Sequence, residues 1–304
     1  MLSRVRVISG CCGWLLSGVT GCLQAQAVPQ PPTVVKIPHM EVAGLHRQYA
    51  NALLEMTLTL SERRYGPYEL VRQTGETVIK RQLLELENGD NLSVAISMPM
   101  PEWLEKTERV PLPIMKGLAS YRLFLARRKN VAAFNAIDNL DALKKLRIGQ
   151  GPGWSTGKIL EDGGFKVVYG GPYPTLLPML NADRFDLLMR SVYEAAAELK
   201  RYQPDMPELA VVDGIALYTY LPMYFFVSKT QPVLAERIEY GLALAYKNGQ
   251  LDELFNRYFS GSLAMLNLEN RRVFYLPNTN IDPSFYESDK PYLLKSVQAG
   301  AEFR

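Results

Sequence analysis

A glycine-rich turn between a predicted strand and a predicted helix is the segment of this chain best suited to ligand binding. The turn is Gly149 to Gly153 (GQGPG), and the helix after it begins with Trp154, Ser155 and Thr156. Glycine allows a backbone to approach a ligand closely, and a hydroxyl side chain can cap the helix while its free N–H groups face an anion. An ordinary tight turn with a capped helix accounts for the same residues. A phosphate-binding P-loop does not, because the Lys-Ser/Thr pair is missing.

Arg190 is the second candidate, because it directly follows the predicted strand Phe185–Met189. Ligands bind at the carboxyl ends of strands in α/β sheets, where a guanidinium can hold an anion. A salt bridge with Asp186, or with Glu194 one helical turn further on, is the competing interpretation. The sequence leaves both interpretations open.

Aromatic and histidine side chains provide further candidates. Trp103 and Trp154 can stack on a ligand ring or a cation, although a buried tryptophan more often belongs to the core. Tyr218 is the member of the aromatic run 218–226 that we expect to contact a ligand, and His39 follows the first predicted strand.

Residues for metal binding or catalysis are few. The chain has two histidines, His39 and His46, and no cysteine after Cys22. Zinc sites and a cysteine nucleophile are therefore not expected, and neither a Gly-x-Ser-x-Gly nor a His-Glu-x-x-His motif is present. The sequence predicts a protein without catalytic residues, metal or cofactor.

The first 27 residues have the features of an export signal. A positively charged start precedes an apolar stretch from Val7 to Val19, and Ala25-Gln26-Ala27 matches a signal-peptidase site. Residues 19–22 (VTGC) also resemble a bacterial lipobox, in which Cys22 is acylated. We favour cleavage after Ala27, because valine replaces the usual leucine of a lipobox. Both alternatives predict export, most simply to a bacterial periplasm.

The composition excludes some partners and suggests the size of the fold. The 34 basic and 31 acidic residues nearly balance, which argues against a nucleic-acid-binding protein. A hydrophobic content of 47% is that of a soluble globular protein. The length allows one large domain or two lobes, and we expect a monomer.

Predicted strands and helices alternate along the chain, which indicates an α/β fold with helical crossovers. The predicted strands are Thr33–Ile37, Tyr68–Arg72, Leu92–Ser97, Tyr121–Ala126, Arg147–Gly149, Phe165–Tyr169, Phe185–Met189, Leu209–Val212 and Tyr224–Val227. The predicted helices are Ala43–Leu60, Glu76–Glu87, Leu140–Leu146, Trp154–Asp162, Thr175–Asn181, Val192–Tyr202, Pro232–Tyr246 and Gln250–Phe259. The first lobe is predicted to comprise 33–120 and 228–304 and the second 127–219, with crossings at 121–126 and 220–227.

Four stretches in this order resemble the type II periplasmic solute-binding proteins of ABC transporters, and most closely the amino-acid-binding family 3. They are Ser97-Met98 with 112–122 (LPIMKGLASYR), 143–154 (LKKLRIGQGPGW), Arg184 to Ser191, and 218–229 (YTYLPMYFFVSK). The resemblance implies two α/β lobes joined by a two-strand hinge. It also implies a cleft that closes on a small ligand, with Ser97 at a strand end on its wall.

One departure from the family concerns the arginine that clamps the carboxylate of an amino-acid ligand. The corresponding position here is Trp103, and Arg109 lies six residues later. The resemblance therefore does not imply a standard α-amino acid as the ligand.

These observations predict a non-enzymatic, exported protein that binds a small polar solute, amino-acid-like or anionic. Its partner would be the permease of an ABC-type transporter or a sensor. A dehydratase-like enzyme on the same fold is the alternative, with His39 or Glu102 as the general acid or base. A stand-alone sensory ligand-binding module is the third possibility.

Overall fold

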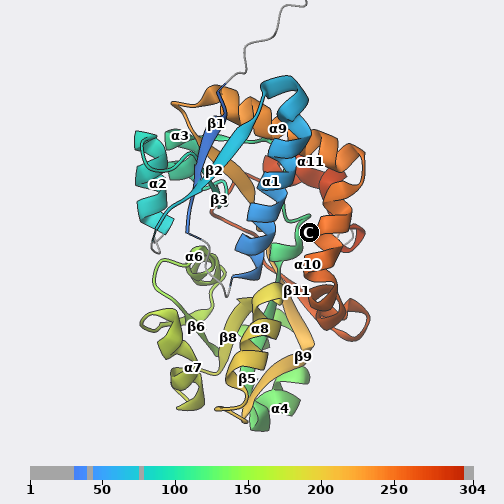
Figure 1. Cartoon of the computed structure of the whole chain (residues 1–304). Coiled ribbons are helices and arrows are strands. Elements are labelled where there is room, and N and C mark those ends of the chain that lie inside the picture. The colour runs from blue at the N-terminus through green and yellow to red at the C-terminus, as the bar shows by residue number, and fades with distance from the viewer. Residues whose placement is uncertain (1–30, 40–43, 75–78, 298–304) are drawn as a thin grey trace, which may run out of the picture. The chain divides into compact units, whose positions relative to one another are not determined.

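The computed structural model describes residues 31–39, 44–74 and 79–297. The signal-peptide and Cys22 predictions fall outside these ranges and stay predictions. All elements described below belong to the unit Pro32–Arg304. Within it, Figure 1 shows two groups of strands with helices packed around each.

The first group of strands forms two small sheets. β1 (Thr33–Ile37) pairs in parallel with β2 (Tyr68–Arg72). β10 (Tyr224–Ser228) lies between β3 (Val94–Ser97) and β4 (Thr107–Arg109) and is antiparallel to both. We call these strands and the helices packed on them the first lobe.

Helices cover the sheets of the first lobe. α1 (Leu45–Tyr65) packs against α9 (Pro232–Lys247) and α10 (Gln250–Leu266). The contact between α1 and α9 needs a glycine, because a Cβ at Gly241 would lie 2.0 Å from the carbonyl oxygen of Thr57.

Two shorter helices lie near β3. α2 is Ile79–Asn88 and α3 is Pro101–Lys106. α3 begins with a proline at its first position, where the missing N–H costs no hydrogen bond.

The second lobe is built on one six-stranded sheet. Across the sheet the order is β11 (Arg272–Tyr275), β9 (Leu209–Tyr218), β5 (Tyr121–Arg127), β8 (Leu187–Ser191), β6 (Arg147–Gln150) and β7 (Lys166–Tyr169). β5 runs antiparallel to its neighbours β8 and β9, whereas β6 pairs in parallel with β7 and β8, and β11 pairs in parallel with β9.

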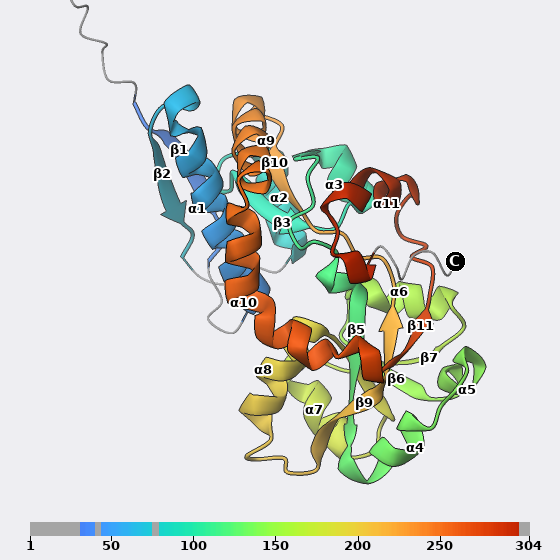
Figure 2. The ribbon, with the colours of Figure 1, turned by 90° about the vertical axis from the view of Figure 1, so that its right-hand side faces the viewer.

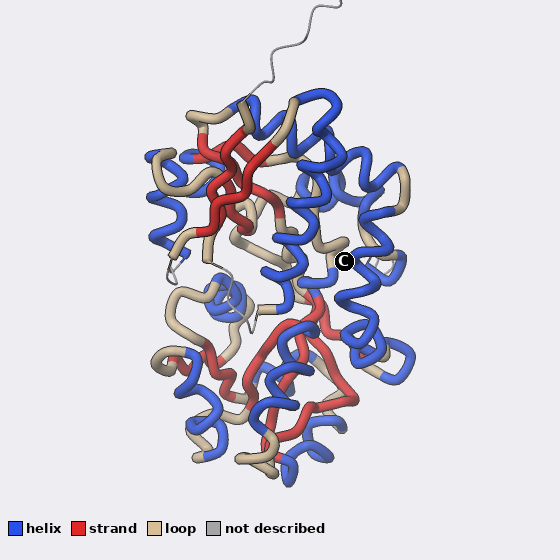
Figure 3. The backbone as a smooth tube through the Cα atoms, in the orientation of Figure 1, coloured by secondary structure: helices blue, strands red, loops and turns tan. Residues whose placement is uncertain are grey.

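In the described part of the chain, five α-helices belong to this sheet, and the tube of Figure 3 shows helices beside its strands. They are α4 (Val131–Asn135), α5 (Leu140–Lys144), α6 (Ser155–Asp162), α7 (Tyr173–Asn181) and α8 (Val192–Tyr202). α6, α7 and α8 follow the carboxyl ends of β6, β7 and β8. Their N-terminal residues therefore meet at one edge of the sheet.

The C-terminal segment (residues 268–297) runs from the second lobe to the first. It contributes β11 to the six-stranded sheet and then continues to α11 (Ser284–Asp289), as Figure 2 shows. Asn280 Nδ2 donates to the carbonyl of Ser155 at 3.0 Å, and Asn278 Nδ2 donates to that of Tyr220 at 2.7 Å. The segment therefore connects the two lobes alongside β5 and the 219–223 crossing.

Most predicted elements appear in the structure. Thr33–Ile37, Tyr68–Arg72 and Val192–Tyr202 have the predicted bounds. The strand predicted at Leu209–Val212 continues to Tyr218, and the sequence did not predict α3, β4, α4 or β11. The proposed lobe and hinge boundaries stay a prediction, although residues 121–126 lie within β5 and 224–227 within β10.

Candidate ligand-binding site

A cavity of about 1080 Å³ is lined by residues of both lobes. Small-molecule sites in proteins have volumes of about 300–1,000 Å³ and mostly apolar walls with a few polar groups. This cavity is slightly larger than that range. Apolar side chains such as Met98, Trp154 and Phe225 line it beside a small set of charged groups.

The structure brings seven of the eight predicted ligand-binding residues to this cavity: His39, Ser97, Trp103, Trp154, Ser155, Thr156 and Arg190. Tyr218 is not among its described lining residues. It is 2% exposed at the end of β9, between β11 and β5, and its ring packs on Tyr121 at 5.2 Å and Tyr275 at 5.4 Å. The placement of Tyr218 gives no support to its predicted contact with a ligand.

Trp103 contributes to the core as well as to the cavity. It is 5% exposed and meets the ring of Phe226 edge-on at 5.2 Å. Arg109, the alternative carboxylate clamp, lies over the rings of Tyr224 and Phe285 and is not among the described cavity residues. Arg109 therefore does not replace the carboxylate-binding arginine of the amino-acid-binding family, whose position Trp103 occupies here.

The glycine-rich turn shapes the start of α6. Gly153 has φ +76°, in the left-handed region that favours glycine. A Cβ at Gly151 would lie 2.5 Å from the Trp154 ring, so this turn needs glycine twice. The ring of Trp154 is thereby held against the backbone at the cavity wall.

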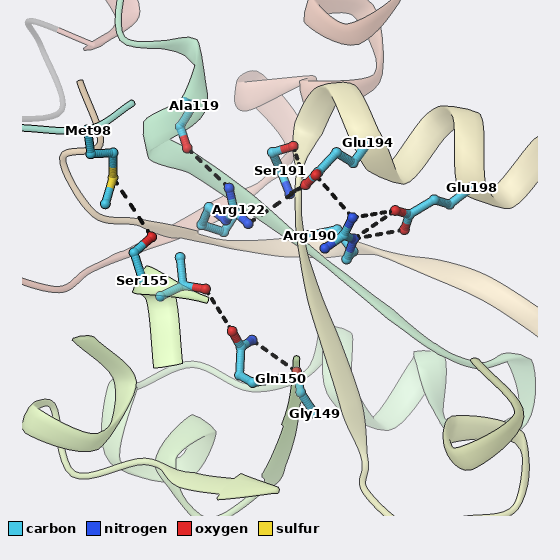
Figure 4. Close-up of polar contacts among 11 residues, drawn as sticks. Met98, Ala119, Arg122, Gly149, Gln150, Ser155, Arg190, Ser191, Glu194 and Glu198 are labelled. Atoms are coloured by element: carbon cyan, nitrogen blue, oxygen red, sulfur yellow. Dashed lines mark hydrogen bonds and ion pairs between the residues drawn. The ribbon is translucent and has the colours of Figure 1, made fainter. Parts of the chain in front are cut away.

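The predicted capping of this helix by a hydroxyl is wrong. Trp154 is the N-cap residue of α6 and makes no side-chain cap. Thr156 Oγ1 instead donates to Oε1 of the buried Gln150 at 2.7 Å, and Ser155 Oγ contacts Met98 Sδ at 3.9 Å across the cavity (Figure 4). The N-terminal end of α6 therefore faces the cavity without a side chain to neutralise its partial positive charge.

Arg190 is bound by two carboxylates. Its Nε lies 2.8 and 3.0 Å from the two carboxylate oxygens of Glu198, and its Nη2 lies 3.0 Å from Glu194. Asp186, the other partner considered from the sequence, pairs with Arg147 instead. Arg190 thus lines the cavity, as predicted, and also forms the competing salt bridge.

Glu194 lies between two arginines (Figure 4). Its Oε2 accepts hydrogen bonds from the backbone N–H of Ser191 at 3.0 Å and from the Ser191 hydroxyl at 2.6 Å, which forms a capping box at the start of α8. Burial alone would raise the pKa of Glu194. Arg190 and Arg122 outweigh burial and lower that pKa to about 2.

Arg122 is a cavity residue that sequence reasoning missed. It lies in β5 opposite Ser191 and is 7% exposed. Its Nη1 makes a long contact of 3.5 Å with the carbonyl of Ala119, and its Nη2 lies 3.9 Å from Glu194. Its Nε is buried without a hydrogen-bond partner among the described residues. A lone arginine within the apolar run YRLFLA was the available signal.

His46 is a second cavity residue that sequence reasoning missed. It lies in the first turn of α1, with its ring 5.2 Å from that of Tyr193. Its Nδ1 is buried and has no partner among the described residues. Burial lowers the pKa of His46 to about 4, so the ring is neutral at pH 7.

The described residues contain no cluster of His, Cys, Asp and Glu side chains suited to a metal ion. None of the helices in the described ranges is long and apolar enough to span a membrane.

Comparison with known proteins gives matches among solved structures alone. No protein-family model and no curated protein matches the chain. An ancestral arginine-binding protein bound to arginine is 16% identical with a TM-score of 0.54, and the match covers 76% of this chain and 100% of that one. The substrate-binding protein of an amino-acid ABC transporter is 15% identical with a TM-score of 0.51, covering 75% and 99%. The chain has the fold of a two-lobed periplasmic binding protein.

Other matches of the same kind include one linked to an enzyme. An arginine-specific periplasmic binding protein of Salmonella typhimurium is 14% identical with a TM-score of 0.52, covering 75% of this chain and 99% of that one. An ancestral amino-acid-binding protein described as a precursor of cyclohexadienyl dehydratase is 15% identical with a TM-score of 0.52, covering 74% and 95%. The resemblance inferred from the sequence is confirmed for the fold, and these neighbours are mostly binding proteins. About a quarter of this chain lies outside each match.

Proposed function

We propose that this protein captures a small solute with a carboxylate group in the cavity between its lobes and delivers it to a membrane transporter. The observation that carries the proposal is Arg122, a buried guanidinium on the cavity wall whose Nε has no hydrogen-bond partner among the described residues. A buried donor left without a hydrogen bond costs about 1–3 kcal/mol, and more when it is charged. A ligand carboxylate would remove this cost and form a charge-assisted hydrogen bond.

The surroundings of Arg122 favour an anionic group over a cationic one. The charges of the inner wall sum to zero: Arg122, Arg190 and Glu198 are buried, and Glu194 is partly buried. Both carboxylates contact Arg190 at 3.0 Å or less, whereas Arg122 approaches Glu194 at 3.9 Å. The uncapped N-terminal end of α6 adds a second group that favours an anion. The apolar part of the solute would pack against Met98, Trp154 and Phe225.

Ligand screening by thermal shift and calorimetry tests this proposal. Amino acids, their amides and short carboxylates would be compared, and a carboxylate at 100 times its Kd should stabilise the protein by about 2.7 kcal/mol. Arg122→Gln should weaken binding about 10- to 100-fold, as loss of a charge-assisted hydrogen bond predicts. Arg127→Gln, at the other end of β5 and paired with Asp183, is the control and should leave affinity unchanged. A wide screen without any ligand would contradict the proposal.

The proposal includes export to the periplasm with a transporter permease or a sensor as partner. The leader features and the fold of the matched binding proteins support it. Mass spectrometry of the mature protein would distinguish an N-terminus at Val28 from an acylated Cys22.

We propose further that the protein acts by binding and not by catalysis. A dehydratase-like reaction would need a general acid on the wall, and Glu198 is a cavity carboxyl whose pKa is raised by burial. Its two oxygens are, however, held by the guanidinium of Arg190. An assay of prephenate and arogenate with wild-type protein, His39→Ala and Glu198→Gln tests this point. Turnover that either substitution abolishes would overturn the non-enzymatic proposal.

A further inference from the structure

Arg190 lies at the place where an α/β sheet of this kind receives its ligands. It is the second-last residue of β8, while Trp154 follows β6 and Tyr173 follows β7. These three parallel strands are neighbours in the sheet, so the residues after their carboxyl ends meet. The position is that of a ligand subsite.

The surroundings of Arg190 are those of a bound cation. Its guanidinium carbon lies 4.5 Å from the ring centre of Trp154 and 4.8 Å from that of Tyr173. Two carboxylates from successive turns of α8, Glu194 and Glu198, complete its contacts. Two carboxylates that accept hydrogen bonds and two aromatic faces are the groups that bind a guanidinium in a water-poor site.

The guanidinium nevertheless belongs to the protein itself. Arg190 is 8% exposed, and it reaches both Glu198 oxygens through its Nε. We propose that Arg190 is the built-in occupant of a guanidinium cage formed by Trp154, Tyr173, Glu194 and Glu198, and that it excludes cationic head groups from this wall of the cavity. Removing the side chain beyond Cβ would leave a space that can hold a small guanidinium ion. The carboxylates of Glu194 and Glu198 would line this space.

The consequence for specificity rests on the proposed function. With the cage filled, both acidic side chains on this wall are already paired, and a ligand with a guanidinium or ammonium group finds no carboxylate free there. By pairing both carboxylates, Arg190 would make the cavity select anionic or neutral solutes. The cage itself does not depend on which solute is natural.

The experiment uses methylguanidinium chloride with wild-type protein and Arg190→Ala, followed by thermal shift and calorimetry at constant ionic strength. Arg190→Ala should bind methylguanidinium saturably in the millimolar range and regain thermal stability. The wild type should bind methylguanidinium at least ten-fold more weakly. Sodium chloride at the same concentration should not raise the thermal stability of either protein. Agmatine, a cation without a carboxylate, should likewise bind Arg190→Ala in preference to the wild type.

Arg147→Ala is the matched control. Arg147 also makes a two-pronged contact with a carboxylate, at 2.8 and 3.2 Å from Asp186, but its side chain is 43% exposed. No aromatic ring among the described residues stacks on it. Truncation there should create no saturable methylguanidinium site.

Two results would overturn the proposal: a folded Arg190→Ala that does not bind methylguanidinium, or a wild type that binds agmatine as well as the variant does. If Arg190→Ala does not fold alone, recovery of folding with methylguanidinium supports the cage. Arg190→Ala/Glu198→Gln, which buries one charge fewer, should then fold and bind more weakly but saturably, and its failure to bind would count against the cage. A wild type that binds no solute at all, beside a variant that binds methylguanidinium, refutes the proposed function and leaves this inference standing.

Discussion

At the scale of single residues, the cavity wall combines charges that are fully paired with groups that are not. Arg190 and Glu198 satisfy each other, and Glu194 is held by its capping box and by Arg190. Arg122 Nε and His46 Nδ1 are buried polar atoms without partners in the described part of the chain. Buried polar groups in proteins are nearly always hydrogen-bonded, so these two atoms of the cavity wall are available to hydrogen-bond a ligand.

His46 gives the wall a pH dependence that can be measured. Because burial favours its neutral form, the folded-state pKa of about 4 lies below the ordinary 6.5, and the unfolded chain binds more protons between these values. Stability should therefore decline as pH falls from 6.5 toward 4, by at most about 1.4 kcal/mol per pH unit. Urea denaturation of wild type and His46→Gln across this range should show the slope in the wild type and a shallower one in the variant. Equal slopes would refute this account.

At the scale of elements, the C-terminal segment is fastened to the first lobe by a buried carboxylate. Asp289 accepts a hydrogen bond from the Tyr220 hydroxyl at 2.6 Å and another from the Tyr224 hydroxyl. Burial raises the pKa of Asp289, and the two hydroxyl donors oppose this shift. The pairing joins α11 to the crossing segment and to β10.

Removing this carboxylate should cost more than removing an exposed one nearby. Asp289→Ala leaves two buried tyrosine hydroxyls without acceptors, and each such loss costs about 1–3 kcal/mol. Urea unfolding should therefore show a decrease of about 2–4 kcal/mol in unfolding free energy. Asp282→Ala, which removes a backbone cap at the exposed start of α11, is the control and should cost less than about 1 kcal/mol. Comparable losses in both variants would contradict a special role for Asp289.

The elements also show what the sequence could and could not predict. The strands and helices with a clear apolar period, such as Thr33–Ile37 and Val192–Tyr202, were found because their signal is local. β11 was missed, since it exists by pairing with β9, which lies more than fifty residues earlier in the chain. The same limitation explains Tyr218: β9 continues six residues past its predicted end, so this tyrosine lies within a sheet and not at a crossing.

The position of most predicted site residues at the cavity follows from topology and needs no knowledge of long-range pairing. Strand ends in a parallel sheet meet at one edge, so Trp154 and Arg190 could be placed together without a structure. Arg122 could not, because its position depends on the antiparallel pairing of β5 with β8. The binding role of these residues stays a prediction until the variants above are measured.

At the scale of the whole molecule, the lobes approach each other across the cavity at Met98 and Ser155, which allows a direct test of closure. Every cysteine of the chain lies among its first 22 residues, so introduced cysteines in the folded part have no native competitors. The Sδ of Met98 is 3.9 Å from the Oγ of Ser155, and a cysteine sulfur at position 98 would stand one bond further back. A disulfide between Met98→Cys and Ser155→Cys therefore needs the lobes to move slightly closer, since an S–S bond is about 2.05 Å long.

A ligand that closes the lobes should accelerate formation of this disulfide, as followed by non-reducing gel electrophoresis. Once formed, the disulfide should slow ligand release, and reduction of the disulfide should restore the original release rate. Met98→Cys alone is the control. Equal rates of disulfide formation with and without a ligand of proven affinity would show that binding does not close the cavity.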